Sequence, residues 1–382
     1  MTIVHAGKCR SLIEIEQTLT KIDGDTAKDK KFVFSLESLK SRHGPMHDTS
    51  RLQMLVTLAR RRLESDFLDI HPNASEEAAI ESVCSYAPGI AAARIAKGIR
   101  LGEICISRRD TLKAAADKMQ ATDAEKFEKV IRGRTLDLIC VSGSTVEFLR
   151  PLFSARSIVK EHSEMNKTMH TVAKIINQQS QEKIPESLLS SLGLFSTELI
   201  KNTKEHAVSD HTGKPHLAHV EGMIFGWTRL NEKLFFKDFS GNAKLKKYWD
   251  NESFITESGI SSLRFFEVSY FDSGPGLVSR FTGRPVKEMS LEEERAFLMK
   301  CLKHKTTSKS QDAAGEGLPS VLSELRKIGG LIRIRSGRLS IFNAFSTENS
   351  KSELFDFEDW SNTPLAAAEG AVISILVPLR AE

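Results

Sequence analysis

The chain has 382 residues, of which 40% are hydrophobic and 27% are charged, a composition typical of soluble globular proteins with two or three domains. Its formal net charge of +4 is too small to indicate nucleic acid as a partner. The five cysteines are scattered without a CxxC pair, which argues against a disulfide framework and against a zinc site. Because the sequence shows neither a membrane-length apolar run nor a secretory leader, we expect a cytoplasmic protein.

Residues 1–155 predict an N-terminal mixed α/β domain with its own core. Strands are indicated by the apolar stretches KFVFSL, DFLDIHP and LDLICVSGS. Between the first two, TSRLQMLVTLARRRLES repeats apolar residues at helical spacing behind a cap at Thr49 or Ser50. This half carries no catalytic constellation, so its role stays open.

Residues 156–184 predict a polar connecting helix with an apolar stripe. It carries His162 and His170, and a sensor kinase places its phosphoacceptor histidine on such a helix. His162 is followed by Ser163 and Glu164, however, without the basic residue and proline of an acceptor motif. We therefore interpret both histidines as surface residues.

Residues 185–382 predict a second domain in which helices and strands do not alternate as in a doubly wound fold. The order is helix 185–207, strands 223–230 and 263–271, helix 319–328, and strands 331–336, 338–344 and 371–378. This order fits an α/β (α+β) sandwich whose mixed, mostly antiparallel sheet is covered by helices on one face.

The stretch STELIKNTKEHA within the first of these helices places an acid and an amide one turn apart, at Glu198 and Asn202. Their oxygens suit Mg²⁺ and the orientation of a water molecule. An ordinary amphipathic helix with solvated charges is the alternative.

Two glycine-containing turns add to this pattern. The strand LRFFEVSYFD stops at Asp272, whose carboxylate can accept from an exocyclic amine, and Gly274 and Gly276 let the backbone approach a flat ring. A polar loop then runs through Gly315 and Gly317 into a helix, where free backbone N–H groups suit a polyphosphate.

In this order the three stretches resemble the N, G1 and G2 boxes of the GHKL ATPases, the superfamily of gyrase B, heat-shock chaperone, histidine kinase and MutL-type ATPase domains. ELIKNTKEHA resembles the N box, FDSGPGL the G1 box, and GEGLPSVLSELRKIGGLIRIRSG the G2 box, while GAVISILVPL resembles the closing strand. The resemblance covers roughly residues 165–380. The chain departs from the family in an insertion of about forty residues before G1, around 230–262, and in a Leu-Pro at the end of G2 where sensor kinases have Leu-Gly.

The resemblance implies a Bergerat-type fold that binds ATP and Mg²⁺. It implies that Asn202 holds Mg²⁺, that Asp272 binds the adenine amino group, and that Glu198 polarises the attacking water. Further nucleotide contacts are implied for Gly274 and Gly276 at the adenine, for Lys309 at the terminal phosphate, and for the backbone at Gly315, Gly317 and Leu318 around the phosphates.

We therefore expect slow ATP hydrolysis that drives a conformational switch coupled to the N-terminal domain and an unknown protein partner. The alternatives are a protein kinase of the histidine or anti-sigma Ser/Thr type and a nucleotide-binding regulator without turnover. A homodimer stays open, and nucleic acid is not indicated even beside the lysines of GNAKLKKYW. HDTSRLQMLVTLARR also resembles the turn and helix of STAS domains, which would make Thr49 or Ser50 a phosphosite; a plain capped helix is the alternative.

Overall fold

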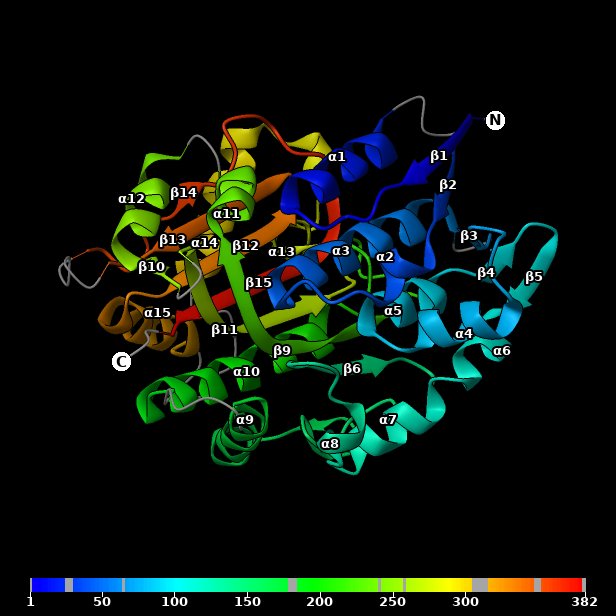
Figure 1. Ribbon diagram of the computed structural model, residues 1–382, viewed down its shortest axis with the longest axis horizontal. Coiled ribbons are helices and arrows are strands. Elements are labelled where there is room, and N and C mark those ends of the chain that lie inside the picture. The colour runs from blue at the N-terminus through cyan, green and yellow to red at the C-terminus, as the bar shows by residue number, and fades with distance from the viewer. Residues whose placement is uncertain are drawn as a thin grey trace.

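The computed structural model describes residues 2–24, 30–63, 66–177, 184–239, 242–256, 259–303, 315–346 and 352–379. Its centre is a large antiparallel sheet with helices packed on it (Figure 1). The predicted mixed α/β class with a mostly antiparallel sheet is thereby confirmed. Within these ranges, no helix combines the length and the apolarity needed to cross a bilayer.

All neighbouring strands of the large sheet run antiparallel. From edge to edge they are β14 (Glu358–Asp359), β13 (Leu339–Ala344), β12 (Leu331–Gly337), β15 (Ala368–Pro378), β11 (Ser261–Asp272), β9 (Val220–Asn231) and β6 (Thr135–Val141), with β10 (Phe254–Ile255) also on β11. The edge strand β6 lies in the predicted N-terminal domain and pairs with β9 along its whole length. The large sheet is thus built from both halves of the chain.

One face of this sheet is covered by the helices that the second half predicts. These are α9 (His162–Ile176), α10 (Glu186–His206) and α15 (Gly317–Ile328), with α8 (Phe127–Val130), α13 (Leu277–Thr282), η3 (Val286–Glu288) and α14 (Leu291–Lys303) beside them. Their apolar side chains share one core with Met223, Tyr270 and Ile373 of the sheet.

The other face is covered too, so the prediction of helices on one face is wrong. Helix α3 (Pro45–Leu58) lies against β15, β11 and β9, and every one of its residues is buried. Alternate strand residues such as Ile224, Phe271 and Val372 point to this side and join Leu52 and Leu55 in a second core. The strands therefore read as continuous apolar runs because both of their faces are buried.

The smaller sheet lies beyond α3 on this side. Its strands β1 (Thr2–Ala6), β2 (Lys30–Phe34), β3 (Leu68–Ile70) and β4 (Gly98–Leu101) are parallel in chain order, and β5 (Ile104–Ser107) returns antiparallel to β4. The accompanying helices are α1 (Leu12–Asp23), α2 (Leu36–Lys40), the π-helix η2 (Ala59–Leu63), α4 (Glu76–Cys84), α5 (Ala87–Ile95), α6 (Arg108–Lys113) and α7 (Ala116–Asp123). A short hairpin of β7 (Phe153–Ala155) and β8 (Ile158–Val159) precedes α9, and β8 falls where the sequence predicts the connecting helix 156–184.

Thr49 and Ser50, one of which the resemblance to STAS domains would make a phosphosite, are buried. Both lie inside α3, and their hydroxyls donate to the carbonyls of Pro45 and Met46. The side chains are 0% and 3% exposed, so in this structure a kinase has no access to either.

The stretch around 230–262, which the resemblance treats as an insertion, forms α11 (Glu232–Phe239) and α12 (Ala243–Glu252). Tyr248 and Trp249 are buried in a third core, so they offer no stacking surface to nucleic acid. Asp238 of α11 accepts from the backbone N of Leu12 and lies 2.7 Å from Nε2 of His47. The insertion therefore ties α1 and α3 to the large sheet.

Candidate functional site

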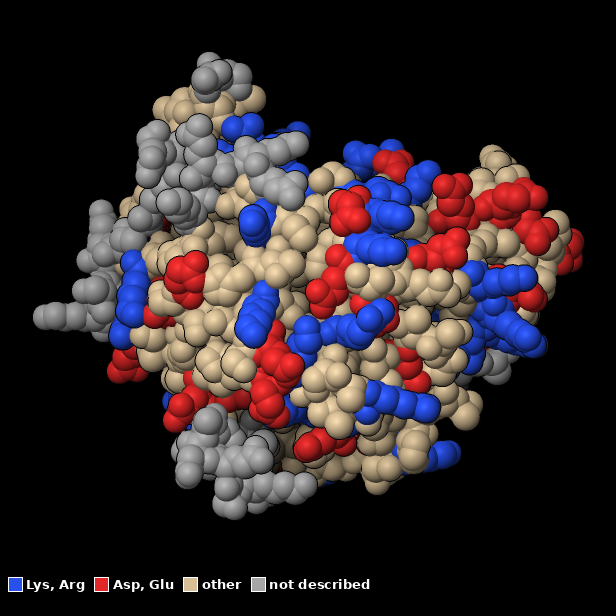
Figure 2. Space-filling view, turned by 90° about the horizontal axis from the view of Figure 1, so that it is seen from below, with Lys and Arg blue, Asp and Glu red and all other residues tan. Residues whose placement is uncertain are grey.

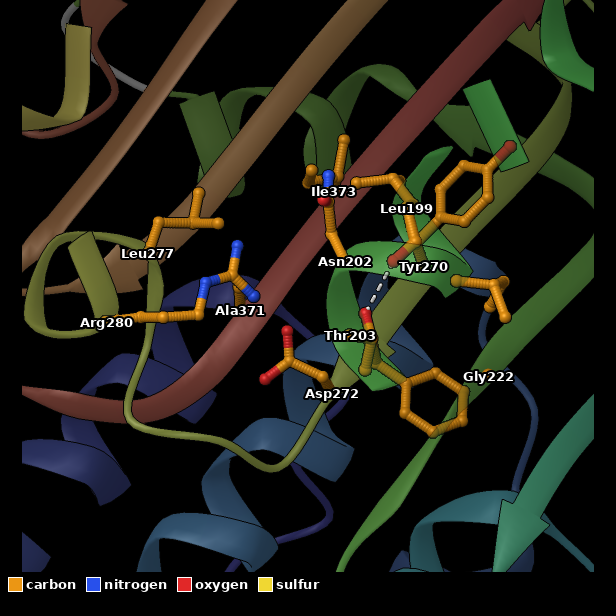
Figure 3. A pocket seen from close by; sticks show the side chains of 12 residues that line it. Leu199, Asn202, Thr203, Gly222, Tyr270, Asp272, Leu277, Arg280, Ala371 and Ile373 are labelled. Carbon is orange, nitrogen blue, oxygen red and sulfur yellow. Dashed lines mark hydrogen bonds between the residues drawn. The ribbon is translucent and has the colours of Figure 1, made fainter. Parts of the chain in front are cut away.

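The predicted amide and carboxylate, Asn202 and Asp272, meet at one end of the large sheet at a small cavity (Figure 3). Helix α10 brings Asn202 to the cavity, and β11 ends there at Asp272. The cavity, which we call the Asp272 cavity, is lined by Leu199, Ile200, Asn202, Thr203, Gly222, Tyr270, Phe271, Asp272, Leu277, Arg280, Ala371 and Ile373. The amide of Asn202 and the carboxylate of Asp272 thus face the same space.

Asp272 is a buried carboxylate with few partners. Its Oδ1 accepts from the backbone N of Gly274 at 2.8 Å. Burial raises the pKa of Asp272, while the Arg280 guanidinium works against this rise. Figure 3 shows Arg280 reaching from α13 into the cavity on the same side as Asp272.

The two glycines after Asp272 are required by packing. A Cβ at Gly274 would lie 2.8 Å from Cα of Ala207 at the end of α10, and Gly276 has φ +85° beside Ser336. Neither glycine lines the Asp272 cavity as the structure stands. Their role at adenine remains a prediction.

Glu198 lies one turn before Asn202 and reaches a different partner. Its Oε1 accepts from the backbone N–H groups of Gly315, Glu316 and Gly317 at 3.0, 3.0 and 3.1 Å. Burial raises the pKa of this half-buried carboxyl, and the three N–H donors oppose the rise. The N-terminal amides of α15, to which the sequence assigns phosphates, thus hold a carboxylate oxygen.

Of the remaining predicted residues, Gly317 and Leu318 lie at the start of α15. A Cβ at Gly317 would come within 2.7 Å of Cα of Phe195, so only glycine fits between α15 and α10. The side chain of Leu318 is buried in the core. Lys309 lies outside the described residues.

The Asp272 cavity is closed in this conformation. It offers a volume of about 20 Å³, which is room for about one water molecule. A purine therefore needs its walls to move, and Arg280 and Leu277 on the short helix α13 are two of these walls.

The sequence prediction missed three polar residues at this end of the sheet. Glu221 of β9 lies directly opposite Asp272, and burial together with the Asp272 charge raises its pKa to about 8. Arg280 lines the cavity, and Arg60 of the π-helix donates to the carbonyl O of Ser273 at 3.0 and 3.2 Å. An acid inside the apolar strand VEGMIF is the signal that identifies Glu221.

The described ranges contain no group of three or more His, Cys, Asp or Glu side chains that could hold a metal ion.

Comparison of the chain with protein-family models, with curated proteins and with solved structures gave no significant match.

Proposed function

We propose that the chain binds ATP with Mg²⁺ between α10, β11 and the start of α15. The observation that carries the proposal is the convergence of Asn202 and Asp272 on one cavity. The three stretches behind this site also follow the order of the GHKL boxes, and its fold would then be of the Bergerat type. The buried carboxylate of Asp272 would accept from the adenine amino group.

The start of α15 supports the phosphate half of this proposal. Three N–H groups there converge on one anionic oxygen of Glu198, which is the geometry that anion sites at helix N-termini use. Asn202 would supply the protein oxygen to Mg²⁺, and the metal ion would neutralise phosphate charge. Phosphate binding requires Glu198 to release these amides.

The N-terminal half contacts the turn that follows Asp272 and the start of β15 beside it. Arg60 holds the carbonyl of Ser273, next to Asp272, and Gln53 of α3 donates to the carbonyl of Gly370 at 3.2 Å. The backbone N of Gly370 in turn donates to the carbonyl of Gly274. A change in the G1 loop would therefore displace contacts of α3 and η2, which is how nucleotide binding acts as a conformational switch.

Slow hydrolysis through Glu198 is the expected reaction. A non-hydrolysing regulator is the second candidate, because Oε1 of Glu198 holds the first N–H groups of α15 in this structure, a capping role that requires no turnover.

Incubation with γ-labelled ATP and MgCl₂, together with an equilibrium binding titration, separates the possibilities. Binding with released phosphate that disappears in Glu198→Gln supports the switch ATPase. Label on the protein identifies a kinase, and binding without either product identifies a regulator. Absence of binding at millimolar ATP contradicts the proposal.

A further inference from the structure

A second, larger cavity lies between α5, α6, α7 and the loop that follows β6. Its volume is about 870 Å³, within the range of roughly 300–1,000 Å³ that small-molecule sites occupy. It shares no lining residue with the Asp272 cavity. We call it the basic cavity, because its lining includes Arg94, Arg108, Arg109 and Lys113.

The positive charge of this cavity is largely uncompensated. Arg109 and Lys113 are exposed, and among the described residues neither side chain makes a hydrogen bond or an ion pair. The lining holds one acid, Asp110, whose carboxylate accepts from the hydroxyl of Ser107 at 2.5 Å and offsets one of the four positive charges. Figure 2 shows a group of Lys and Arg side chains at the right-hand side of its face, next to a group of Asp and Glu, on the side where α4 and α6 lie in Figure 1.

Arg94 of α5 adds a further positive charge to the lining of the cavity. Its Nε donates to the carbonyl of Ser142 at 2.6 Å, and burial and the neighbouring Arg108 lower the pKa of its guanidinium. The charge of Glu147 opposes this lowering of the Arg94 pKa, and the Glu147 carboxylate accepts from the backbone N of Gly143. Gly143 has φ +68°, and a Cβ there would lie 3.0 Å from Nη2 of Arg94. The loop can therefore approach the guanidinium this closely only with glycine at position 143.

The rest of the lining combines hydroxyls with apolar side chains. Ser142, Ser144 and Thr145 come from the loop after β6. Leu112, Met119, Val141 and Val146 supply apolar surface. A ligand matched to this lining carries more than one negative charge at one end and an apolar body at the other.

We propose that the basic cavity binds a small organic phosphate, a molecule with one or more phosphate groups on a flat or apolar body. Arg109, Lys113 and Arg94 hold the phosphate, because arginine and lysine are the side chains that bind phosphate oxygens best. The apolar body lies against Met119 and Leu112. The proposal goes beyond ATP binding at the Asp272 cavity and does not depend on it.

The test is isothermal titration of the full chain at low salt with two probes, inorganic phosphate and 1-naphthyl phosphate. The variant is Arg109→Ala with Lys113→Ala, and both side chains are exposed, so the fold does not depend on them. The matched control is Arg156→Ala with Lys129→Ala, which removes the same charge from exposed positions outside the cavity.

We expect 1-naphthyl phosphate to bind more tightly than inorganic phosphate. The cavity variant should lose about tenfold in affinity for it, with the control within about twofold of the parent, since tenfold corresponds to the loss of two screened charge contacts. Three results overturn the proposal. They are no binding of 1-naphthyl phosphate at millimolar concentration, equal affinity for the two probes, and equal weakening in the cavity variant and the control variant.

Discussion

At the scale of single residues, the contact that Glu198 makes in the structure and the role proposed for it in water activation exclude each other in time. In the structure it accepts three N–H bonds at the first turn of α15, while the family resemblance assigns it to water activation. A carboxylate at a helix N-terminus stabilises the helix and competes with any other anion for the same amides.

Replacing Glu198 with Ala is therefore expected to lower the free energy of unfolding by about 1–2 kcal/mol, as the loss of a helix cap does. Affinity for ATP should rise at the same time, by up to about tenfold, because phosphates no longer displace a carboxylate. Urea unfolding and ATP titration measure the two effects. Glu205→Ala, on the exposed side of α10, is the control, and a stability loss no larger than this control's contradicts the capping role.

Glu221 gives a prediction about pH. Its pKa is raised from 4.5 to about 8 in the folded chain, so its contribution to stability is fully present below pH 4.5 and is lost as pH rises through about 8. Glu221→Gln, which never ionises, should match the parent near pH 4.5 and be more stable by a few kcal/mol at pH 9, since one pKa unit is about 1.4 kcal/mol.

Thermal unfolding between pH 4.5 and pH 9 measures this difference. The exposed Glu103→Gln serves as the control. Parallel stability curves for Glu221→Gln and the parent would show that Glu221 is ionised in the folded chain.

The residues of this site differ in how well the sequence predicts them. Asn202 and Asp272 were predicted to lie together because the stretches that carry them resemble two boxes of one nucleotide site, and the elements that hold them, α10 and β11, are both predicted from the sequence. The partner of Glu198 could not, because its hydrogen bonds join residues more than a hundred positions apart and leave no local pattern. Arg60 was missed for the same reason, since its bonds to the carbonyl of Ser273 span 213 positions.

At the scale of elements, α3 and α11 decide how the two halves join. His47 and Asp238 are fully buried, and their contact at 2.7 Å joins the N-terminal half to the insertion. The pKa of His47 is raised: burial opposes the rise, and the Asp238 hydrogen bond and charge cause it.

Asp238→Asn is expected to lower the free energy of unfolding by roughly 3 kcal/mol, because removing one partner leaves the other buried and unpaired. The backbone N of Leu12 also loses a charged acceptor. Chemical denaturation of the variant, with the exposed Asp250→Asn as control, tests the contact. A loss equal to that of the control would mean that the insertion does not clamp α1 and α3.

Most strands of the large sheet and the helices α10 and α15 could be predicted from the sequence, since they fall within a few residues of the expected ranges. Their packing could not. The apolar residues at helical spacing in α3 indicate a helix but not that its polar side, with Asp48 and Arg51, is buried as well. The pairing of β6 with β9 joins strands about eighty residues apart in the sequence. The pattern of apolar residues in each strand does not show which strand it pairs with or which residues lie opposite each other.

At the scale of the whole molecule, the shared sheet and the buried helix α3 predict one cooperative unit. Urea unfolding followed by tryptophan fluorescence, which reports on Trp227, Trp249 and Trp360 in the second half, should coincide with unfolding followed by far-UV circular dichroism. Two separated transitions would indicate that the halves unfold independently.

The central claim is that the Asp272 site binds Mg·ATP. Isothermal titration of the full chain with ATP in MgCl₂ should give a saturable heat, and Asp272→Ala should weaken binding by at least about tenfold, as loss of a hydrogen bond to a charged group does. Asp117→Ala, an exposed acid on α7, should bind as the parent does. If Asp272→Ala binds ATP as tightly as the parent, the assignment of this site is contradicted.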